Sequence, residues 1–214
     1  MTTEQLKVDA LGTTRLVRGR DGAFVERDTR TAHSALRWLA RRLAAREAAA
    51  LAALAGETRV PRLIAFDGKV VRRSYLPGAP LYEGAPRSRV YFVDALRLLR
   101  RMHRAGIAHN DLAKEANWLV TAGGGCAIVD FQLAIRSPAR TARFRRYAYE
   151  DLRHLLKHKR TYQPLELTAR QRSVLARPTL SARLWRALVK PPYRFVTRVV
   201  LRWPERAGPI ERSG

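Results

Sequence analysis

Apolar residues along the chain change their spacing twice, and each change predicts a different kind of element. Up to about residue 30 they occur in short runs separated by glycines, and residues 23–27 form the clearest strand. Over residues 31–55 leucines recur at three- and four-residue steps, which predicts a long helix. Residues 60–76 then form two apolar runs around an Asp-Gly dipeptide, which is typical of a hairpin turn.

Helical spacing dominates the second half of the chain. Residues 89–104 place apolar side chains on or near one helical face, and residues 147–159 also have a helical pattern. Between them, residues 118–129 predict a small hairpin that turns at Gly123–Gly125. Strands with one helix, followed mainly by helices, indicate an α+β protein with a sheet-rich N-lobe and a helical C-lobe. We expect the N-lobe, the C-lobe and a C-terminal tail to occupy residues 1–80, 81–170 and 171–214.

Two short polar segments contain the residue types that phosphoryl transfer requires. Asp111 and Asn117 lie on one predicted loop with Lys114 between them, and Asp130 follows an apolar strand. This reaction needs a carboxylate near the acceptor hydroxyl, oxygen ligands for Mg²⁺ and cations near the transferred phosphate. These four residues supply that set if the two segments meet in space.

The same segments carry a resemblance to a known family. Residues 102–118 resemble the His-Arg-Asp…Asn catalytic loop of protein kinases, and residues 128–132 resemble their Asp-Phe-Gly magnesium motif. The pattern is most similar to compact prokaryotic branches: RIO-type kinases, aminoglycoside-phosphotransferase-like proteins and lipopolysaccharide-core (Kdo/heptose) kinases. It is dense over residues 96–134 and loose over residues 23–81. The resemblance implies a two-lobe protein-kinase-like fold.

It also implies a role for each polar residue. Asp111 takes the place of the catalytic base, Asn117 and Asp130 those of the metal ligands, and His109 braces the loop. We expect Lys114 to stabilise phosphate charge. The implied cofactors are ATP and Mg²⁺. The implied acceptor is a hydroxyl on a protein serine or threonine, or on a lipopolysaccharide-type sugar or lipid.

On the nucleotide side, the resemblance places Arg27 where kinases have the strand lysine that binds the α- and β-phosphates. Glu47, in the long helix, is then its expected partner. Ser74 and Leu76 fall on the connector whose backbone holds adenine in related enzymes. Arg73, just before the connector, either lines the nucleotide pocket or lies on a strand that turns one of two arginines to solvent.

Several positions depart from the kinase pattern. Arg27 keeps the charge of the lysine but has a planar head of different reach. Gln132 replaces the glycine of Asp-Phe-Gly, and Asn117 lies one residue further from Asp111 than is usual. No Gly-x-Gly-x-x-Gly loop precedes residue 24. Arg27 and the missing glycine loop favour a second hypothesis, a catalytically impaired pseudokinase that acts as a nucleotide-binding or membrane-surface scaffold.

The charge of the chain restricts its partners only broadly. It contains 42 Lys and Arg against 18 Asp and Glu, a formal net charge of +24. Such a field attracts polyanions, so nucleic acid is not excluded as a partner. Residues 181–203 alternate basic with apolar and aromatic positions, as an interfacial membrane helix does. The same pattern fits a helix packed on the C-lobe. A third hypothesis is therefore an adaptor that binds a membrane or nucleic acid through this tail.

Features that would place the chain outside the cytoplasm are not recognised in the sequence. No apolar run approaches the length of a membrane span, and the first residues lack a signal-peptide layout. We expect a cytoplasmic protein, either free or peripheral at the inner face of the cytoplasmic membrane. The single cysteine, Cys126, cannot form an intramolecular disulfide, and we expect it to be a small buried residue of a strand.

Overall fold

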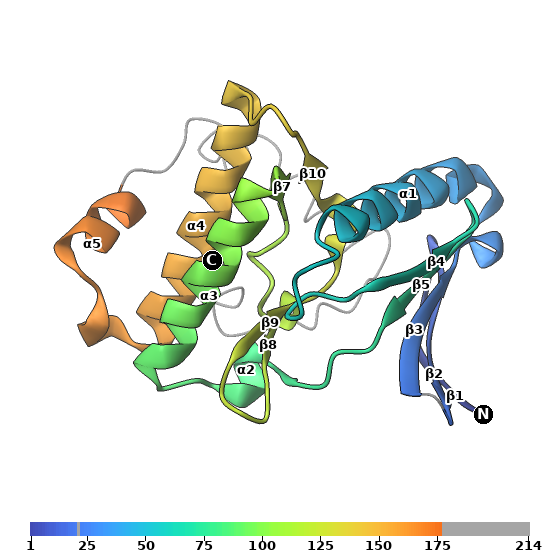
Figure 1. Ribbon diagram of the computed structural model, residues 1–214, viewed down its shortest axis with the longest axis horizontal. Coiled ribbons are helices and arrows are strands. Elements are labelled where there is room, and N and C mark those ends of the chain that lie inside the picture. Colours follow the sequence, from blue (N-terminus) through green and yellow to red (C-terminus); the bar gives the residue numbers. More distant parts are fainter. Residues whose placement is uncertain (21, 177–214) are drawn as a thin grey trace, which may run out of the picture.

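The computed structural model describes residues 1–20 and 22–176. The N-terminal part is a five-stranded antiparallel sheet with the strand order β1-β2-β3-β5-β4 (Figure 1). Its strands have the following bounds: β1 Thr2–Asp9, β2 Gly12–Gly19, β3 Gly22–Asp28, β4 Leu63–Phe66 and β5 Val70–Ser74. The predicted strand at residues 23–27 and the predicted hairpin at residues 60–76 are both confirmed.

One long helix, α1 (Arg37–Ala53), accompanies this sheet. It begins later than the predicted residue 31, because two 3-10 turns, Thr29–Thr31 and Ser34–Leu36, precede it. The Asp28 side chain accepts a hydrogen bond from the Arg30 backbone N–H and thereby stabilises the first turn. A side chain that bonds to nearby backbone in this way competes with helix formation, which the apolar spacing alone does not reveal.

Helices dominate the remainder of the described chain. They are α2 (Leu81–Gly84), α3 (Arg89–Arg104), α4 (Ala142–Tyr162) and α5 (Ala169–Ala176). Five short strands accompany them: β6 Ala79–Pro80, β7 Ile107–Ala108, β8 Trp118–Val120, β9 Cys126–Ile128 and β10 Ile135–Arg136. Helix α3 and the β8–β9 hairpin lie where they were predicted. The fold class is α+β with a sheet-rich N-terminal region and a helical C-terminal region, as the sequence predicts.

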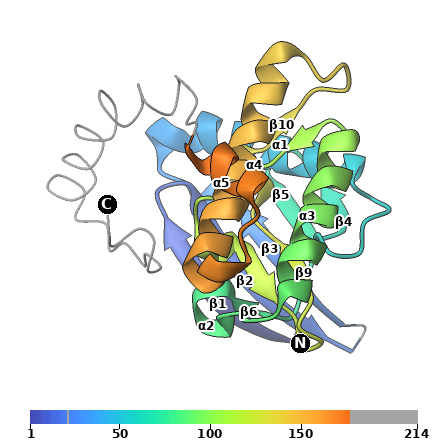
Figure 2. The ribbon, with the colours of Figure 1, turned by 90° about the vertical axis from the view of Figure 1, so that its left-hand side faces the viewer.

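Helix α4 is longer at both ends than the predicted residues 147–159. Its additional N-terminal turn is capped by Thr141, whose hydroxyl accepts a hydrogen bond from the Phe144 backbone N–H at 3.3 Å. Helices α3 and α4 pack against each other, and from the helical side they lie in front of the sheet (Figure 2). The expected tail boundary at residue 171 falls within α5, and residues 181–203 lie outside the described residues.

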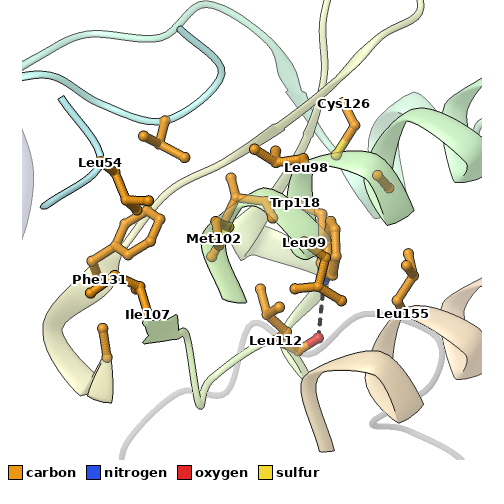
Figure 3. Close-up of a cluster of buried hydrophobic side chains, with 14 of the residues drawn as sticks. Leu54, Leu98, Leu99, Met102, Ile107, Leu112, Trp118, Cys126, Phe131 and Leu155 are labelled. Atoms are coloured by element: carbon orange, nitrogen blue, oxygen red, sulfur yellow. Dashed lines mark hydrogen bonds between the residues drawn. The ribbon is translucent and has the colours of Figure 1, made fainter. Parts of the chain in front are cut away.

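The main hydrophobic core is centred on α3 (Figure 3). Leu98, Leu99 and Met102 are buried on this helix against Trp118 of β8. The Trp118 indole Nε1 donates a hydrogen bond to the Leu112 carbonyl at 3.0 Å, shown as the dashed line in Figure 3. This hydrogen bond and the burial of Leu112 attach the loop between β7 and β8 to the core. Among the described residues, no helix is both long and apolar enough to cross a bilayer.

Cys126 is fully buried in β9, as expected. Burial raises the pKa of its thiol to about 12, and the thiolate is the form that reacts. At pH 8 we expect the native protein to react with Ellman's reagent only as fast as it unfolds, whereas protein in guanidinium chloride reacts at once. Stoichiometric labelling of the folded protein within seconds, followed by absorbance, would contradict this expectation.

Candidate functional site

The loop between β7 and β8 is anchored at its start by His109. This side chain is fully buried, and its Nε2 lies 3.0 Å from the Val129 carbonyl oxygen. Its ring packs against Phe131 with the ring centroids 4.7 Å apart. His109 thus connects the loop to the end of β9, the strand that leads to Asp130.

A buried carboxylate on α4, Asp151, provides a second anchor for the loop. Its Oδ2 accepts a hydrogen bond from the His109 backbone N–H at 2.7 Å, and its Oδ1 accepts one from the Asn110 N–H at 2.9 Å. The His103 Nε2 lies 3.2 Å from the same Oδ2. Sequence reasoning did not assign Asp151 to the site. The available signal was an acidic residue next to the buried leucines of a predicted helix.

The predicted catalytic residues of the loop are in direct contact. The Lys114 ammonium lies 2.7 Å from Asp111 Oδ2. The Asn117 side-chain amide donates to the Asp111 carbonyl at 2.9 Å and to Asp111 Oδ2 at 3.2 Å. Residues Glu115–Asn117 form a 3-10 turn, which accommodates the additional residue between Asp111 and Asn117. The longer spacing therefore does not separate these two side chains.

The segment that carries Asp130 is joined to this loop through its backbone. The Val129 N–H donates to the Asn117 carbonyl at 3.0 Å, which joins the residue before Asp130 to the loop. Asp130 has a left-handed backbone with φ +68°, a conformation that costs a non-glycine residue about 1 kcal/mol. Its Oδ1 is buried and has no hydrogen-bond partner among the described residues.

The unsatisfied oxygen of Asp130 has the chemistry of a magnesium ligand. Burying a carboxylate oxygen without a partner costs free energy, and a hydrogen-bond donor or a bound cation removes this cost. Asp130 and the amide oxygen of Asn117 are hard ligands of the kind Mg²⁺ prefers, and the ion normally completes its shell with water and phosphate oxygens. Within residues 1–20 and 22–176, no group of three or more His, Cys, Asp and Glu side chains could hold a metal ion.

Glu47 of α1 does not form the ion pair expected from the sequence. It is fully buried and pairs with Arg73 of β5, in place of Arg27. The strand register explains why Arg73 can take the place of Arg27 as the partner of Glu47. Arg73 lies opposite Val25, and Val25 and Arg27 face the same side of the sheet, so the two arginines share one face. Arg72 lies on the other face and pairs with Glu26 at 2.8 Å.

Arg27 consequently retains a free donor inside the site. Its Nη1 is buried and has no hydrogen-bond partner among the described residues. Burial lowers the pKa of Arg27, and the carboxylates of Glu47, Asp130 and Asp9 oppose this shift. A guanidinium remains charged under such conditions. The structure therefore places an unsatisfied cation within the electrostatic field of Asp130.

The two other residues expected to hold the nucleotide lie at and beyond the end of β5. The Ser74 hydroxyl accepts a hydrogen bond from the Arg62 N–H at 2.8 Å. Leu76 lines a hollow of about 640 Å³, together with the connector that follows it and the β8–β9 turn. Of the predicted site residues only Leu76 lines this hollow. None of the residues predicted to be catalytic lines the hollow.

We expect Asp151→Asn to lower the free energy of unfolding by about 1–3 kcal/mol, because an amide cannot accept all the hydrogen bonds that converge on this carboxylate. The measurement is urea denaturation followed by circular dichroism. The matched control is Glu166→Gln, since Glu166 is an exposed carboxylate just beyond α4. Equal stability of the two variants would show that the Asp151 contacts do not support the fold.

Comparisons with known proteins extend this picture. No family model matches the chain, and no curated protein matches it. Among solved structures, the Rio2 kinase from Chaetomium thermophilum superposes with a TM-score of 0.59 at 18% sequence identity. The match covers 78% of this chain and 60% of that chain, so this protein spans about 60% of the length of the Rio2 kinase. At this identity the likeness concerns the fold alone. The chain has a two-lobe protein-kinase-like fold.

Proposed function

We propose that this protein is an ATP- and Mg²⁺-dependent phosphotransferase that transfers the γ-phosphoryl group to a hydroxyl. One observation carries the proposal. Hydrogen bonds join Asn117 to Asp111, and the Asn117 carbonyl accepts the N–H of the residue before Asp130. The buried Oδ1 of Asp130 itself has no hydrogen-bond partner among the described residues. A base, an amide and a carboxylate on two segments joined in this way are the groups that phosphoryl transfer needs.

Each site residue has a separate role in the proposed reaction. Asp111 orients the acceptor hydroxyl and accepts its proton, while Lys114 offsets negative charge beside it. Asn117 and Asp130 would hold Mg²⁺, which neutralises phosphate charge when bound. The unpaired Nη1 of Arg27 donates hydrogen bonds to phosphate oxygens, which guanidinium groups bind readily. Ser74 and Leu76 bind the adenine side through the connector.

We place the protein among compact prokaryotic kinase-like proteins of the RIO, aminoglycoside-phosphotransferase or lipopolysaccharide-kinase type. The acceptor is a protein serine or threonine, or a sugar hydroxyl of lipopolysaccharide type. We propose residues 1–80 and 81–170 as the two lobes and residues 171–214 as the tail. The basic pattern of residues 181–203 supports a position at the inner membrane surface, where each cation adds about 1 kcal/mol of attraction to anionic lipid.

A second candidate is a pseudokinase scaffold that binds nucleotide without turnover. Two observations favour it: arginine replaces the strand lysine at position 27, and Glu47 pairs with Arg73. Both would change how the triphosphate is held. The scaffold and the enzyme share the requirement for nucleotide binding and differ only in phosphoryl transfer.

The deciding experiment measures both properties on the full chain. We expect Mg-ATP to raise the melting temperature, since a ligand at 100 times its Kd adds about 2.7 kcal/mol of stability. EDTA and Asp130→Asn should each remove most of that shift. Transfer of label from γ-labelled ATP to the protein or to an extract fraction identifies the enzyme, and stabilisation without transfer identifies the scaffold. No stabilisation at millimolar Mg-ATP would refute both.

A further inference from the structure

A second hollow, of about 430 Å³, lies where the end of α3 meets the start of α4. Its lining comes from three segments: the last turn of α3, the turn before α4 and the first turns of α4. The lining residues are His103, Arg104, Ala139, Arg140, Phe144, Arg145 and Ala148. None of the residues assigned above to phosphoryl transfer lines it, and its volume is within the range of small-molecule sites.

The charge of this hollow is one-sided. Arg104, Arg140 and Arg145 all line it, and no carboxylate does. Within the described part of the chain, none of these three guanidinium groups forms an ion pair, and only that of Arg145 forms a hydrogen bond, to the Arg140 carbonyl at 3.5 Å. Guanidinium groups bind tetrahedral oxyanions through paired donors. The hollow therefore presents unused donors for a phosphate.

The backbone holds Arg140 at this place at some cost. Arg140 has a left-handed conformation with φ +48°, and its N–H donates to the Ser137 carbonyl at 2.9 Å. A non-glycine residue keeps such a conformation only where its surroundings impose it. Here the turn places a third guanidinium beside those of the two helices.

The hollow is also connected to the loop that carries Asp111. His103 packs edge-on against Phe144, with ring centroids 6.3 Å apart, and contacts Asp151. Asp151 in turn accepts the backbone N–H groups of His109 and Asn110. A separate connection runs through the backbone, because the Ser137 N–H donates to the Gly106 carbonyl at 2.8 Å. A ligand that fixes these walls would also steady the loop.

We propose that this hollow binds a phosphate group, either free or on a small molecule, and that its occupancy orders the loop bearing Asp111. The binding does not depend on the proposed phosphotransferase activity. The significance of the ordered loop for catalysis rests on that proposed function.

Binding is tested by isothermal titration of the full chain with inorganic phosphate at constant ionic strength, after the nucleotide site has been saturated with a non-hydrolysable Mg-ATP analogue. We expect Arg104→Gln/Arg145→Gln to weaken binding about tenfold or more. The control Arg100→Gln/Arg146→Gln removes the same charge from exposed positions of the same helices that do not line the hollow. Equal weakening by both double variants, or no binding to the unsubstituted protein, would overturn the proposal.

Glucose 6-phosphate, titrated in parallel, distinguishes the two sources of the group: tighter binding than inorganic phosphate indicates a phosphorylated small molecule, and weaker binding indicates free phosphate. Ordering of the loop is read by hydrogen exchange. We expect phosphate to slow exchange of the His109 and Asn110 amides severalfold in the unsubstituted protein but not in Arg104→Gln/Arg145→Gln. Binding without any change at these amides would overturn the coupling. Absence of nucleotide binding would refute the proposed function yet leave the phosphate titration interpretable.

Discussion

Replacement of Asp111 by asparagine is expected to reduce phosphoryl transfer about 100- to 10,000-fold, the usual contribution of a positioned general base. The side chain keeps its shape and its neighbours, Lys114 and Asn117, but loses the ability to accept the proton of the acceptor hydroxyl. Because Asp111 is not assigned to the metal, the affinity for Mg-ATP should change little. The measurement is transfer from γ-labelled ATP, with nucleotide affinity followed by thermal shift.

The control for this substitution is Glu83→Gln, which removes one carboxylate from the exposed end of α2. Its rate and affinity should equal those of the unsubstituted protein. If Asp111→Asn transfers phosphate as fast as Glu83→Gln, Asp111 is not the base. If it loses nucleotide binding instead, the residue belongs with the metal ligands.

The second large effect is expected at Arg27. Replacement by methionine preserves much of the buried volume and removes a guanidinium whose buried Nη1 has no hydrogen-bond partner among the described residues. We expect the KM for ATP to rise about tenfold or more, because a charge-assisted hydrogen bond to phosphate contributes about 1.5–3 kcal/mol. Arg27→Lys should retain part of this binding, since it keeps the charge but loses the paired geometry.

Arg72→Met provides the matched control for Arg27. Arg72 lies on an adjacent strand, faces away from Arg27 and pairs with Glu26, and its side chain is 52% exposed. Its loss should leave the KM unchanged. The Arg27 assignment fails if both methionine variants shift the KM equally, since the effect would then come from net charge. It fails too if neither variant shifts it.

Local patterns in the sequence were sufficient for much of the fold. The apolar spacing of residues 89–104 coincides with α3, and the Asp-Gly and Gly-Gly-Gly turns lie in the hairpins where they were predicted. Each of these depends on contacts within a few residues, so a short window contains the necessary information. The α+β order of elements follows from the same windows. The residues proposed for catalysis were also identified at this level, because their motif is nearly contiguous.

Long-range pairing decided the rest. Whether Glu47 contacts Arg27 or Arg73 depends on the register of β3 against β5 and on how α1 lies across them, and spacing along the chain specifies neither. The contact of Asp151 was not predictable for the same reason, because it joins α4 to the His109 backbone across 42 residues of sequence.

The sequence by itself therefore determined the order of the elements and pointed to the loop that is proposed for catalysis. Only the tertiary structure decided which charges face one another inside the protein and that three arginines surround one hollow. The physical reason is that helical and strand periodicity is a property of neighbouring residues. The partner of a buried charge, in contrast, is selected by desolvation and by the packing of distant elements, which exist only in the folded chain.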